Sequence, residues 1–349
     1  MSTFEREHLL SVLTDAKPAL SAGGIIPALS HFWFDTKYVY AYDGGLGVRL
    51  DLKSELDCGI PGKTLYDLLK TSTVKEVFLD IVKDDVVLQL GKPKVKLAPL
   101  DGSQTPWNFP ASPPKKEGAS LVLSEQILAA LHRVLFVRAS KPIYAVNHGV
   151  TFEPFDEHLE LYTTDNSSIA QVVVDEQLSK DVPRFVAPWA FLGSVLELVE
   201  PGAVLHVLDN CLMVGAAGVL ICSNVMELPD KPDLPDMVDR LLTKQKPIAL
   251  PTGFQSVLDR VLILAGADEA LLTLTTSEDS IHIQAKYVLG SVDETLPLKG
   301  KPTEVTGQFS ATLISRALSH ADSFSISKKA LALHGGKDFL YIMAAKTGK

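Results

Sequence analysis

Residues 62–97 read GKTLYDLLKTSTVKEVFLDIVKDDVVLQLGKPKVKL and show a pattern that recurs along the chain. The opening residues of this stretch place Leu65, Leu68 and Leu69 on one face, which is the spacing of an amphipathic α-helix. Three short runs rich in Val, Leu and Ile follow, as is typical of β-strands. The stretch is therefore predicted to be a helix followed by a run of strands.

The same order of elements occurs three times along the 349 residues. Each third opens with an amphipathic helix, continues with a hairpin-like pair of strands and a second helix, and closes with strands. The predicted helices are 4–17, 62–71, 124–137, 188–199, 252–264 and 310–320. The predicted closing strands are 77–82, 86–90, 95–97, 204–208, 212–216, 219–222, 324–327, 330–333 and 339–344. Each third is far longer than the roughly 20–50 residues of a solenoid repeat, so each can hold its own core.

Two proline-rich segments separate the thirds. Residues 101–118 contain Pro106, Pro110, Pro113 and Pro114, and residues 228–246 contain Pro229, Pro232 and Pro235. Both follow the last strand of one third and precede the first helix of the next, as expected of linkers. The sequence therefore predicts domains at 1–118, 119–246 and 247–349.

Local signals mark the starts of two helices. Thr252 and Gln255 have the spacing of a capping box, in which both side chains bind free backbone amides. Ser124 is predicted to cap the helix that begins the second third. In the hairpins, Asp43 and Asp165 occupy matching places before Gly44 and Asn166, which indicates turn residues rather than catalytic carboxylates.

Composition limits the functional classes. The chain is 46% hydrophobic with a formal charge of -9, which argues against nonspecific adhesion to nucleic acid through the whole surface but allows a local basic face. No apolar run reaches the roughly 18 residues of a membrane span, and the first residues do not resemble a signal peptide. Cys58, Cys211 and Cys222 are dispersed, as in reduced cytoplasmic proteins.

Motifs for catalysis are missing from the sequence. The glycine run at residues 44–47 lies between strands rather than before a helix, so it is not a phosphate-binding loop. The His and Cys residues do not have the spacing of a metal site or of a nucleophile with its base. We therefore expect no enzyme, no catalytic residue, no bound metal and no cofactor.

Several segments carry a family resemblance. FEREHLL at 4–10, IPAL at 26–29, IPGKTLYDLL at 60–69, TTDNSSIA at 163–170 and FLYIMA at 339–344 resemble, in this order, segments of the bacterial DNA polymerase III β subunits, the sliding clamps. The resemblance covers the whole chain and all three predicted domains. No single segment is specific for the family, so the resemblance depends on the order in which the segments occur. The chain is thereby identified as a divergent member.

The resemblance implies an α+β fold of three tandem clamp domains, each with two helices packed on antiparallel sheets. Two chains would join head to tail into a closed ring, with helices around the hole. Such a ring would encircle duplex DNA and tether a replicative polymerase, and a clamp loader and the polymerase would bind through short peptide motifs. A ring trapped on DNA needs only weak phosphate contacts, which suits an acidic protein with basic inner helices.

The resemblance also assigns three sets of residues. The proposed DNA contacts are the cations and one tyrosine on helix faces and in one loop: Lys63, Lys70, Arg133, Arg138, Lys141, Tyr144, Arg260 and Arg316. On any single helix such cations would be ordinary solvated residues, but they recur on equivalent helices. The proposed ring contact joins Val95 and Leu97 to Ile263 and Leu264 of a second chain. The proposed partner groove is formed by Thr164, Asn166, Ile169, Pro229, Leu234, Ile342 and Ala344.

The chain departs from the family pattern at three places. Residues 166–168 read Asn-Ser-Ser where Gly-His-Arg is usual, and residues 344–349 replace a Met-Pro-Met ending. The glycine loop at 22–25 lacks an arginine that contacts DNA in the family. Because two of these segments build the partner groove, we expect a wider or differently gated groove with altered partner choice.

Two other functions stay open at this point. A clamp-fold scaffold or decoy could bind clamp partners without sliding on DNA, and it would lack the basic inner face. An unfamiliar hydrolase would instead show acids, bases or metal ligands gathered in a cleft.

Overall fold

A computed structural model describes residues 1–23, 25–114, 118–139, 144–179, 181–225, 233–242, 246–266 and 269–346. By its contacts the chain forms two compact units. Unit 1 consists of Met1–Leu128, Ser179–Pro183 and Ala187–Val225, and unit 2 consists of Ala129–Leu178, Arg184–Val186 and Met226–Lys349. Each unit therefore includes part of the second predicted domain, and the three-domain division stays a prediction.

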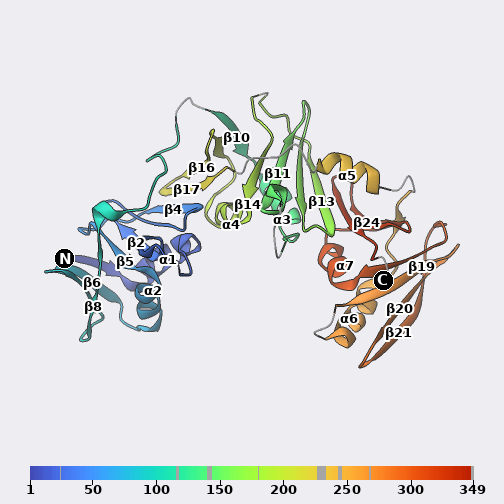
Figure 1. The fold of residues 1–349 in the computed structure, drawn as a ribbon, viewed down its shortest axis with the longest axis horizontal. Coiled ribbons are helices and arrows are strands. Elements are labelled where there is room, and N and C mark those ends of the chain that lie inside the picture. Colours follow the sequence, from blue (N-terminus) through green and yellow to red (C-terminus); the bar gives the residue numbers. More distant parts are fainter. Residues whose placement is uncertain are drawn as a thin grey trace. The chain divides into compact units, whose positions relative to one another are not determined.

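Unit 1 contains two antiparallel sheets (Figure 1). The smaller sheet has the order β1-β6-β7-β8, and the larger has the order β10-β15-β16-β17-β4-β3-β2-β5-β9. The strands are β1 (Ser2–Glu5), β2 (His31–Phe34), β3 (Tyr38–Tyr42), β4 (Leu46–Asp51), β5 (Cys58–Pro61), β6 (Glu76–Val82), β7 (Asp85–Gln89), β8 (Lys94–Leu97), β9 (Leu100–Asp101), β10 (Ala119–Leu123), β15 (Ala203–Val207), β16 (Cys211–Ala216) and β17 (Val219–Asn224). The helices are α1 (Arg6–Ala16), α2 (Gly62–Thr71) and α4 (Trp189–Leu198), with short 3-10 turns η1 (Lys17–Ala19), η2 (Pro27–Ser30) and η3 (Gly102–Gln104).

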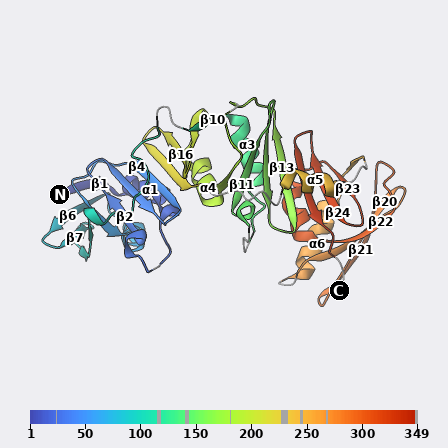
Figure 2. The same ribbon diagram turned by 45° about the horizontal axis from the view of Figure 1, so that its top comes forward.

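Unit 2 has the same plan (Figure 2). Its larger sheet has the order β14-β11-β12-β13-β25-β24-β23-β18, and its smaller sheet has the order β21-β20-β19-β22. The strands are β11 (Gly149–Pro154), β12 (Leu159–Thr164), β13 (Ser168–Val174), β14 (Phe185–Pro188), β18 (Ile248–Ala249), β19 (Leu271–Thr276), β20 (Ser280–Tyr287), β21 (Gly290–Pro297), β22 (Val305–Ser310), β23 (Ser323–Ile326), β24 (Ala330–Gly335) and β25 (Phe339–Ala344). The helices are α3 (Glu125–Val134), most of which belongs to this unit, α5 (Leu234–Leu241), α6 (Phe254–Ala265), α7 (Ala311–Leu318) and the 3-10 turn η4 (Ala145–Asn147).

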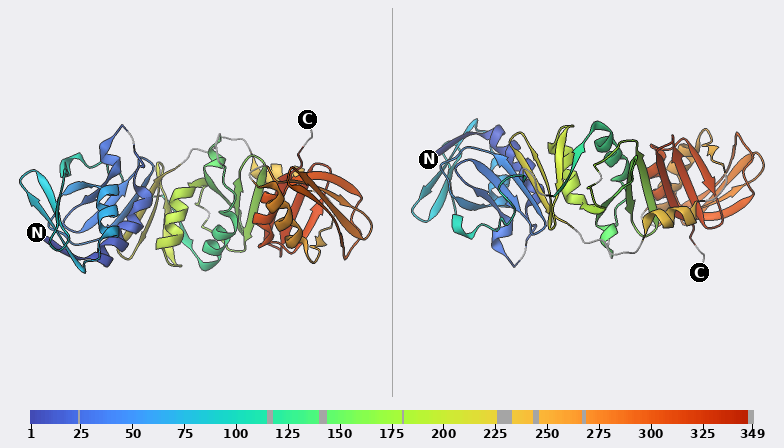
Figure 3. Two further views of the ribbon diagram at one scale, coloured as in Figure 1. Left: turned by 90° about the horizontal axis from the view of Figure 1, so that it is seen from below. Right: turned by 90° about the horizontal axis from the view of Figure 1, so that it is seen from above.

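Each large sheet joins strands from two predicted domains. In unit 1, β17 pairs with β4, and in unit 2, β13 pairs with β25. Figure 3 shows both junctions, where yellow strands lie beside blue ones and green strands beside red ones. Apolar residues of the helices fill the space against the sheets, as shown by the fully buried Leu9 and Leu13 of α1 and Leu65 and Leu69 of α2.

The predicted order of helices and strands is confirmed, with three differences. Phe4 lies in β1, where it pairs with Val77, so the first helix begins only at Arg6. The predicted capping box at Thr252 and Gln255 is wrong, because Gly253 is the N-cap with φ +87° and no side chain caps the helix. Helix α5 lies inside the second predicted linker.

The cap predicted at Ser124 is confirmed, since its Oγ accepts a hydrogen bond of 3.2 Å from the amide of Ile127. Gln255 instead donates from Nε2 to Oδ1 of Asp259 at 2.7 Å, which keeps its amide away from the helix start. The helix begins after a left-handed glycine, so a side-chain cap at Thr252 would lie one residue too early.

Candidate functional site

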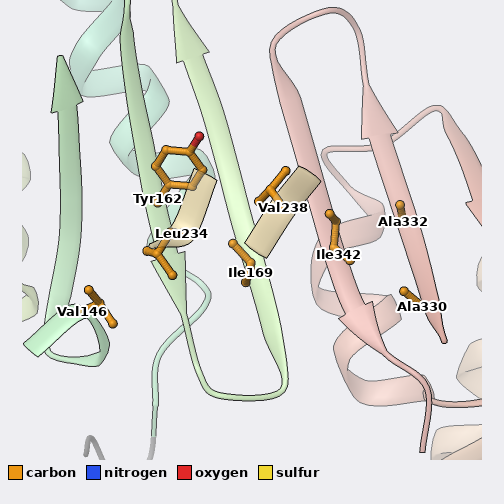
Figure 4. Packing of buried hydrophobic residues seen from close by; sticks show 8 residues of the cluster. All are labelled: Val146, Tyr162, Ile169, Leu234, Val238, Ala330, Ala332 and Ile342. Atoms are coloured by element: carbon orange, nitrogen blue, oxygen red, sulfur yellow. The ribbon is translucent and has the colours of Figure 1, made fainter. Parts of the chain in front are cut away.

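A groove lies in unit 2, along the junction of β13 and β25. It has a volume of about 740 Å³ and is lined by Tyr144, Val146, Asn147, Thr164, Asn166, Ser167, Ser168, Ile169, Asp233, Leu234, Asp236, Met237, Arg240, Leu241, Ile342 and Ala344. Its floor is formed by Val146, Ile169, Leu234 and Ile342, which belong to a larger cluster of buried apolar side chains from β12, β13, β24, β25, η4 and α5 (Figure 4). An apolar groove of this size fits a few side chains of a short peptide or a small molecule.

A tight turn between β12 and β13 forms one rim of the groove. Oδ1 of Asp165 accepts hydrogen bonds from the amides of Ser167 and Ser168 at 2.9 and 2.8 Å, and from Oγ of Ser168 at 2.9 Å. Asn166 has φ +73°, a left-handed conformation that Asn tolerates better than most residues. The same turn occurs in unit 1, where Oδ1 of Asp43 accepts from the amides of Gly45 and Leu46. The prediction that both aspartates are turn residues is confirmed.

Pairing of β13 with β25 brings distant residues together on the floor. Ile169 lies opposite Ile342, and the amide of Ala344 donates to the carbonyl of Ser167 at 3.0 Å. Both isoleucines are buried. In Figure 4 their side chains lie on the face of the sheet that also carries Ala330 and Ala332. The strand pairing therefore joins residues that are far apart in the sequence in one buried apolar cluster.

Helix α5 forms the opposite wall. Asp233 caps it by accepting a hydrogen bond of 3.1 Å from the amide of Asp236, and Pro235 near its start fits the first turn. Leu234 and Val238 are buried in the cluster, and Met237 packs against it. Asp236 and Arg240 also line the groove, and Nε of Arg240 donates to Oδ1 of Asp236 at 3.0 Å, so this wall combines apolar side chains with an ion pair.

A polar network continues from the floor along the same face of β12 and β13. The Tyr162 hydroxyl donates to the Glu160 carboxylate, and Nε2 of Gln171 donates to both groups, at 3.1 Å to Glu160 and 3.0 Å to Tyr162. Burial and the adjacent Glu160 raise the pKa of Tyr162 well above its ordinary value, so the phenol stays protonated. The Tyr162 ring is thereby fixed under α5.

The structure brings together every predicted groove residue that it describes, namely Thr164, Asn166, Ile169, Leu234, Ile342 and Ala344. Pro229 and residues 347–349 lie outside the described residues. The rest of α5 was not predicted, although its apolar residues have helical spacing, namely Leu234, Met237, Val238 and Leu241. Tyr144, predicted to contact DNA, is exposed and lines this groove.

The Asp165 turn yields a test of the groove's architecture. Replacing Asp165 with Ala should destabilise the protein by about 1–2 kcal/mol, because the change leaves two backbone amides of the turn without their acceptor. Chemical denaturation measures the loss. Asp175→Ala, an exposed aspartate after the end of β13, is the control and should cost less than about 0.5 kcal/mol. Equal losses in both variants would show that the turn hydrogen bonds do not stabilise the rim.

The predicted DNA contacts have different surroundings in the structure. Lys70 and Arg316 are exposed on α2 and α7. Lys63 is exposed and pairs with Asp67 at 2.6 Å. Arg260 forms two hydrogen bonds to Glu294, at 2.7 and 2.6 Å, and these raise its pKa further. An exposed cation can leave its carboxylate partner for a phosphate group at little cost, because exposed ion pairs contribute little stability.

Arg133 and the residues after α3 differ from these helical cations. Arg133 is half-buried, pairs with Asp338 and lies over the Phe339 ring at 5.1 Å from its centroid. Nε of Arg138 donates to the carbonyl of Leu135 at 3.2 Å, and Lys141 lies outside the described residues. A DNA role for these three residues stays a prediction.

The residues predicted to close a ring lie at the edges of the small sheets. Val95 is half-buried and Leu97 buried in β8, an end strand of the small sheet of unit 1. Ile263, near the end of α6, is 73% exposed, and Leu264 is half-buried. Both border a hollow of about 370 Å³ that is also lined by residues 291–294 of β21, an end strand of the small sheet of unit 2.

Two features of other protein classes are absent from the residues that the structure describes. No helix in this part of the chain is long and apolar enough to span a membrane. No group of three or more His, Cys, Asp and Glu side chains within the described ranges could hold a metal ion.

The comparisons with known proteins concern the whole chain. No protein-family model and no curated protein matches its sequence. Among solved structures, it is similar to the DNA polymerase III β subunit of Thermotoga maritima, with 17% identity and a TM-score of 0.82, and to the DNA polymerase sliding clamp of Bacillus subtilis, with 17% and 0.82. It is also similar to the sliding clamp of Bartonella birtlesii bound to griselimycin, with 16% identity and a TM-score of 0.86. Each match covers 99% of this chain and 99% of the other, so the chain has the α+β fold of the DNA polymerase III β sliding clamps.

Proposed function

We propose that the protein is a DNA sliding clamp, an accessory subunit without catalytic activity that tethers a replicative polymerase to duplex DNA in the cytoplasm. The observation that carries this proposal is the match in fold over 99% of both chains to solved sliding clamps. A clamp needs no sequence-specific contacts, because a closed ring is held on DNA by its topology. A fold maintained at such low identity favours a function that depends on shape.

The ring itself would be a homodimer joined head to tail. Each unit ends its small sheet in a strand without a second neighbour among the described strands, β8 in unit 1 and β21 in unit 2. Unpaired edge strands favour association, and two different edges on one chain can close a ring of two. We propose that Val95 and Leu97 of one chain meet Ile263 and Leu264 of the other, beside the hollow next to β21.

The groove of unit 2 would bind the polymerase and the clamp loader. Its buried apolar floor, half-buried α5 residues and polar rim suit a short peptide with a few apolar anchors. Binding through a flexible tail would be weak and exchangeable, which allows partners to replace one another. The short side chains of Ser167 and Ser168 leave the end of the groove near the turn open.

A scaffold or decoy is the second candidate, and one observation favours it. Several of the predicted DNA-binding cations already have carboxylate partners, as in Arg133–Asp338 and Arg260–Glu294. Such a protein would keep the partner groove but would not be retained on DNA. The two candidates therefore differ in topological retention rather than in peptide binding.

Retention on end-blocked DNA tests the proposal. The protein is incubated with linear duplex DNA, both ends are then blocked with streptavidin, and free protein is removed at high salt. A clamp should stay on the DNA and should leave after one end is freed by a restriction enzyme. Protein that never withstands high salt would favour the scaffold, and retention that is independent of the ends would contradict a sliding ring.

The exposed helix cations give a separate prediction. The logarithm of the DNA-binding constant falls as the logarithm of the salt concentration rises. In the double variant Lys70→Gln, Arg316→Gln, the slope of this fall should become less steep by about 1 for each residue that contacts a phosphate. Binding to a short duplex at several salt concentrations measures the slope. Lys92→Gln with Lys286→Gln removes the same charge from exposed sites on hairpins and should leave the slope nearly unchanged. Equal slopes for the two double variants would show that the phosphate contacts lie elsewhere.

A further inference from the structure

Unit 1 contains a counterpart of the groove at the junction of β4 and β17. Both junctions follow a hairpin with the same aspartate turn, at Asp43 in unit 1 and Asp165 in unit 2. In unit 1, Gly47 lies opposite Tyr42 on β3 and Cys222 on β17. In unit 2, the corresponding position is Ile169, which lies opposite Thr164 on β12 and Ile342 on β25. The next strand outward carries Met213 in unit 1 and Ala332 in unit 2.

The unit 1 counterpart is occupied by the chain itself. Residues 105–110, with the sequence TPWNFP, cross this junction, and Trp107 and Phe109 pack into a cluster with Tyr42, Cys211, Met213, Leu220 and Cys222. The Trp107 ring is 5.3 Å from the Tyr40 ring, and the Phe109 ring is 5.3 Å from the Tyr42 ring, both edge to face. In unit 2, the described part of the corresponding linker forms α5, which lines one wall of the groove.

Gly47 is the residue that makes room for the two rings. A Cβ at this position would lie 2.9 Å from Cε2 of Phe109 and 3.0 Å from Cζ3 of Trp107. Gly47 is a strand residue within β4. Its lack of a side chain is therefore explained by the aromatic rings above it, at the position where the open groove has Ile169.

The segment is attached in the manner of a bound peptide. The Tyr40 hydroxyl donates to Oγ1 of Thr105 at 3.0 Å, and Nε1 of Trp107 donates to the carbonyl of Phe109 at 3.0 Å, within the segment. Phe109 is buried and Trp107 half-buried, while Asn108 between them is exposed. A hollow of about 380 Å³ remains beside Phe109 and is also lined by Cys211. Two aromatic anchors separated by one exposed residue thus occupy the site.

We propose that unit 1 carries a second peptide-binding site, closed by residues 105–110 acting as an intramolecular ligand. The site takes short segments with two aromatic side chains separated by one residue. With the resident segment in place, this site of unit 1 is closed to other proteins. This inference rests on the geometry of unit 1 and does not depend on DNA binding or on partner binding in unit 2.

The reactivity of the buried thiols tests the proposal without removing the aromatic rings. Cys211 and Cys222 lie under the segment, whereas Cys58 lies in β5 of the same sheet, and all three are buried. Gly47→Ala should displace the rings and speed maleimide labelling of Cys211 and Cys222 at least tenfold, with Cys58 unchanged. Gly45→Ala is the matched control, since a Cβ there has no heavy atom closer than 3.7 Å, and it should change none of the rates. Unchanged labelling of Cys211 and Cys222 in Gly47→Ala, or an equal increase at Cys58, would overturn the proposal.

Replacement of the resident segment by a free peptide tests the ligand class. In the Trp107→Ala, Phe109→Ala variant, the peptide acetyl-QTPWNFPA-amide should slow the labelling of Cys211 and Cys222 at least tenfold. The peptide with both aromatic residues changed to Ala should give no protection, and adding Gly47→Ala to the variant should abolish it. Peptide bound in unit 2 would not shield these thiols, so the result is independent of the proposed function. If the folded variant shows no protection, the site does not bind such peptides. If the variant does not fold, the labelling rates of Gly47→Ala and Gly45→Ala decide whether residues 105–110 close the site.

Discussion

An Ile263→Lys variant is expected to be a folded monomer, with a dimer dissociation constant at least 100-fold higher than that of the wild type. Ile263 is 73% exposed, so lysine at this place should not disturb the core of unit 2. In the proposed ring the same side chain would be buried against β8 of the second chain, where an unpaired ammonium group is costly. Sedimentation velocity over a range of concentrations measures the change.

The matched control for this variant is Ile26→Lys. Ile26 is also exposed, at 57%, but lies in unit 1 before η2 and away from β8 in the sequence. It should leave the dimer intact, and loss of retention on end-blocked DNA should accompany only the monomeric variant. Wild-type self-association in Ile263→Lys would place the contact between chains elsewhere.

A Met237→Lys variant is expected to weaken binding of clamp-binding peptides at least tenfold, which corresponds to about 1.4 kcal/mol. Met237 is half-buried on the groove side of α5 and packs against the floor cluster. Lysine there would place a charge beside Leu234 and Val238, where a peptide anchor would remove its water. Fluorescence anisotropy with a labelled peptide measures the affinity.

Asp239→Lys controls for the effect of a new positive charge on α5. Asp239 is exposed and is not part of the groove lining, so the peptide should bind with nearly unchanged affinity. Thermal unfolding of both variants should show that α5 is still packed. Equal affinities for wild type and Met237→Lys would mean that partners bind at another surface.

The order of helices and strands could be predicted because it depends on local patterns. Leu65 and Leu69 of α2, or Leu9 and Leu13 of α1, have the spacing that places them on the buried face of a helix. The turns at Asp43 and Asp165 could be predicted for the same reason, since the hydrogen bonds of each aspartate reach only two and three residues along the chain.

The features that were missed depend on context. Helix α5 was not predicted, because it lies in a segment whose prolines and charges are typical of a linker. Pro235 is nevertheless compatible with a helix, since it lies in the first turn. The pairing of Arg133 with Asp338 joins residues 205 positions apart, and nothing near Arg133 in the sequence indicates it. The capping box at Thr252 matched by spacing, but Gly253 changes the backbone direction before the helix starts.

The sheet junctions have a consequence for expressing parts of this protein. A fragment that begins at 119 and ends at 246 would separate β17 from β4 and β13 from β25. It would expose two strands with buried side chains along their full hydrogen-bonding edges, and such edges promote aggregation. Fragments for crystallography or NMR should instead keep each pair of joined strands in one molecule. One example joins residues 129–178 directly to residues 226–349, the two long segments of unit 2, so that β13 and β25 stay together.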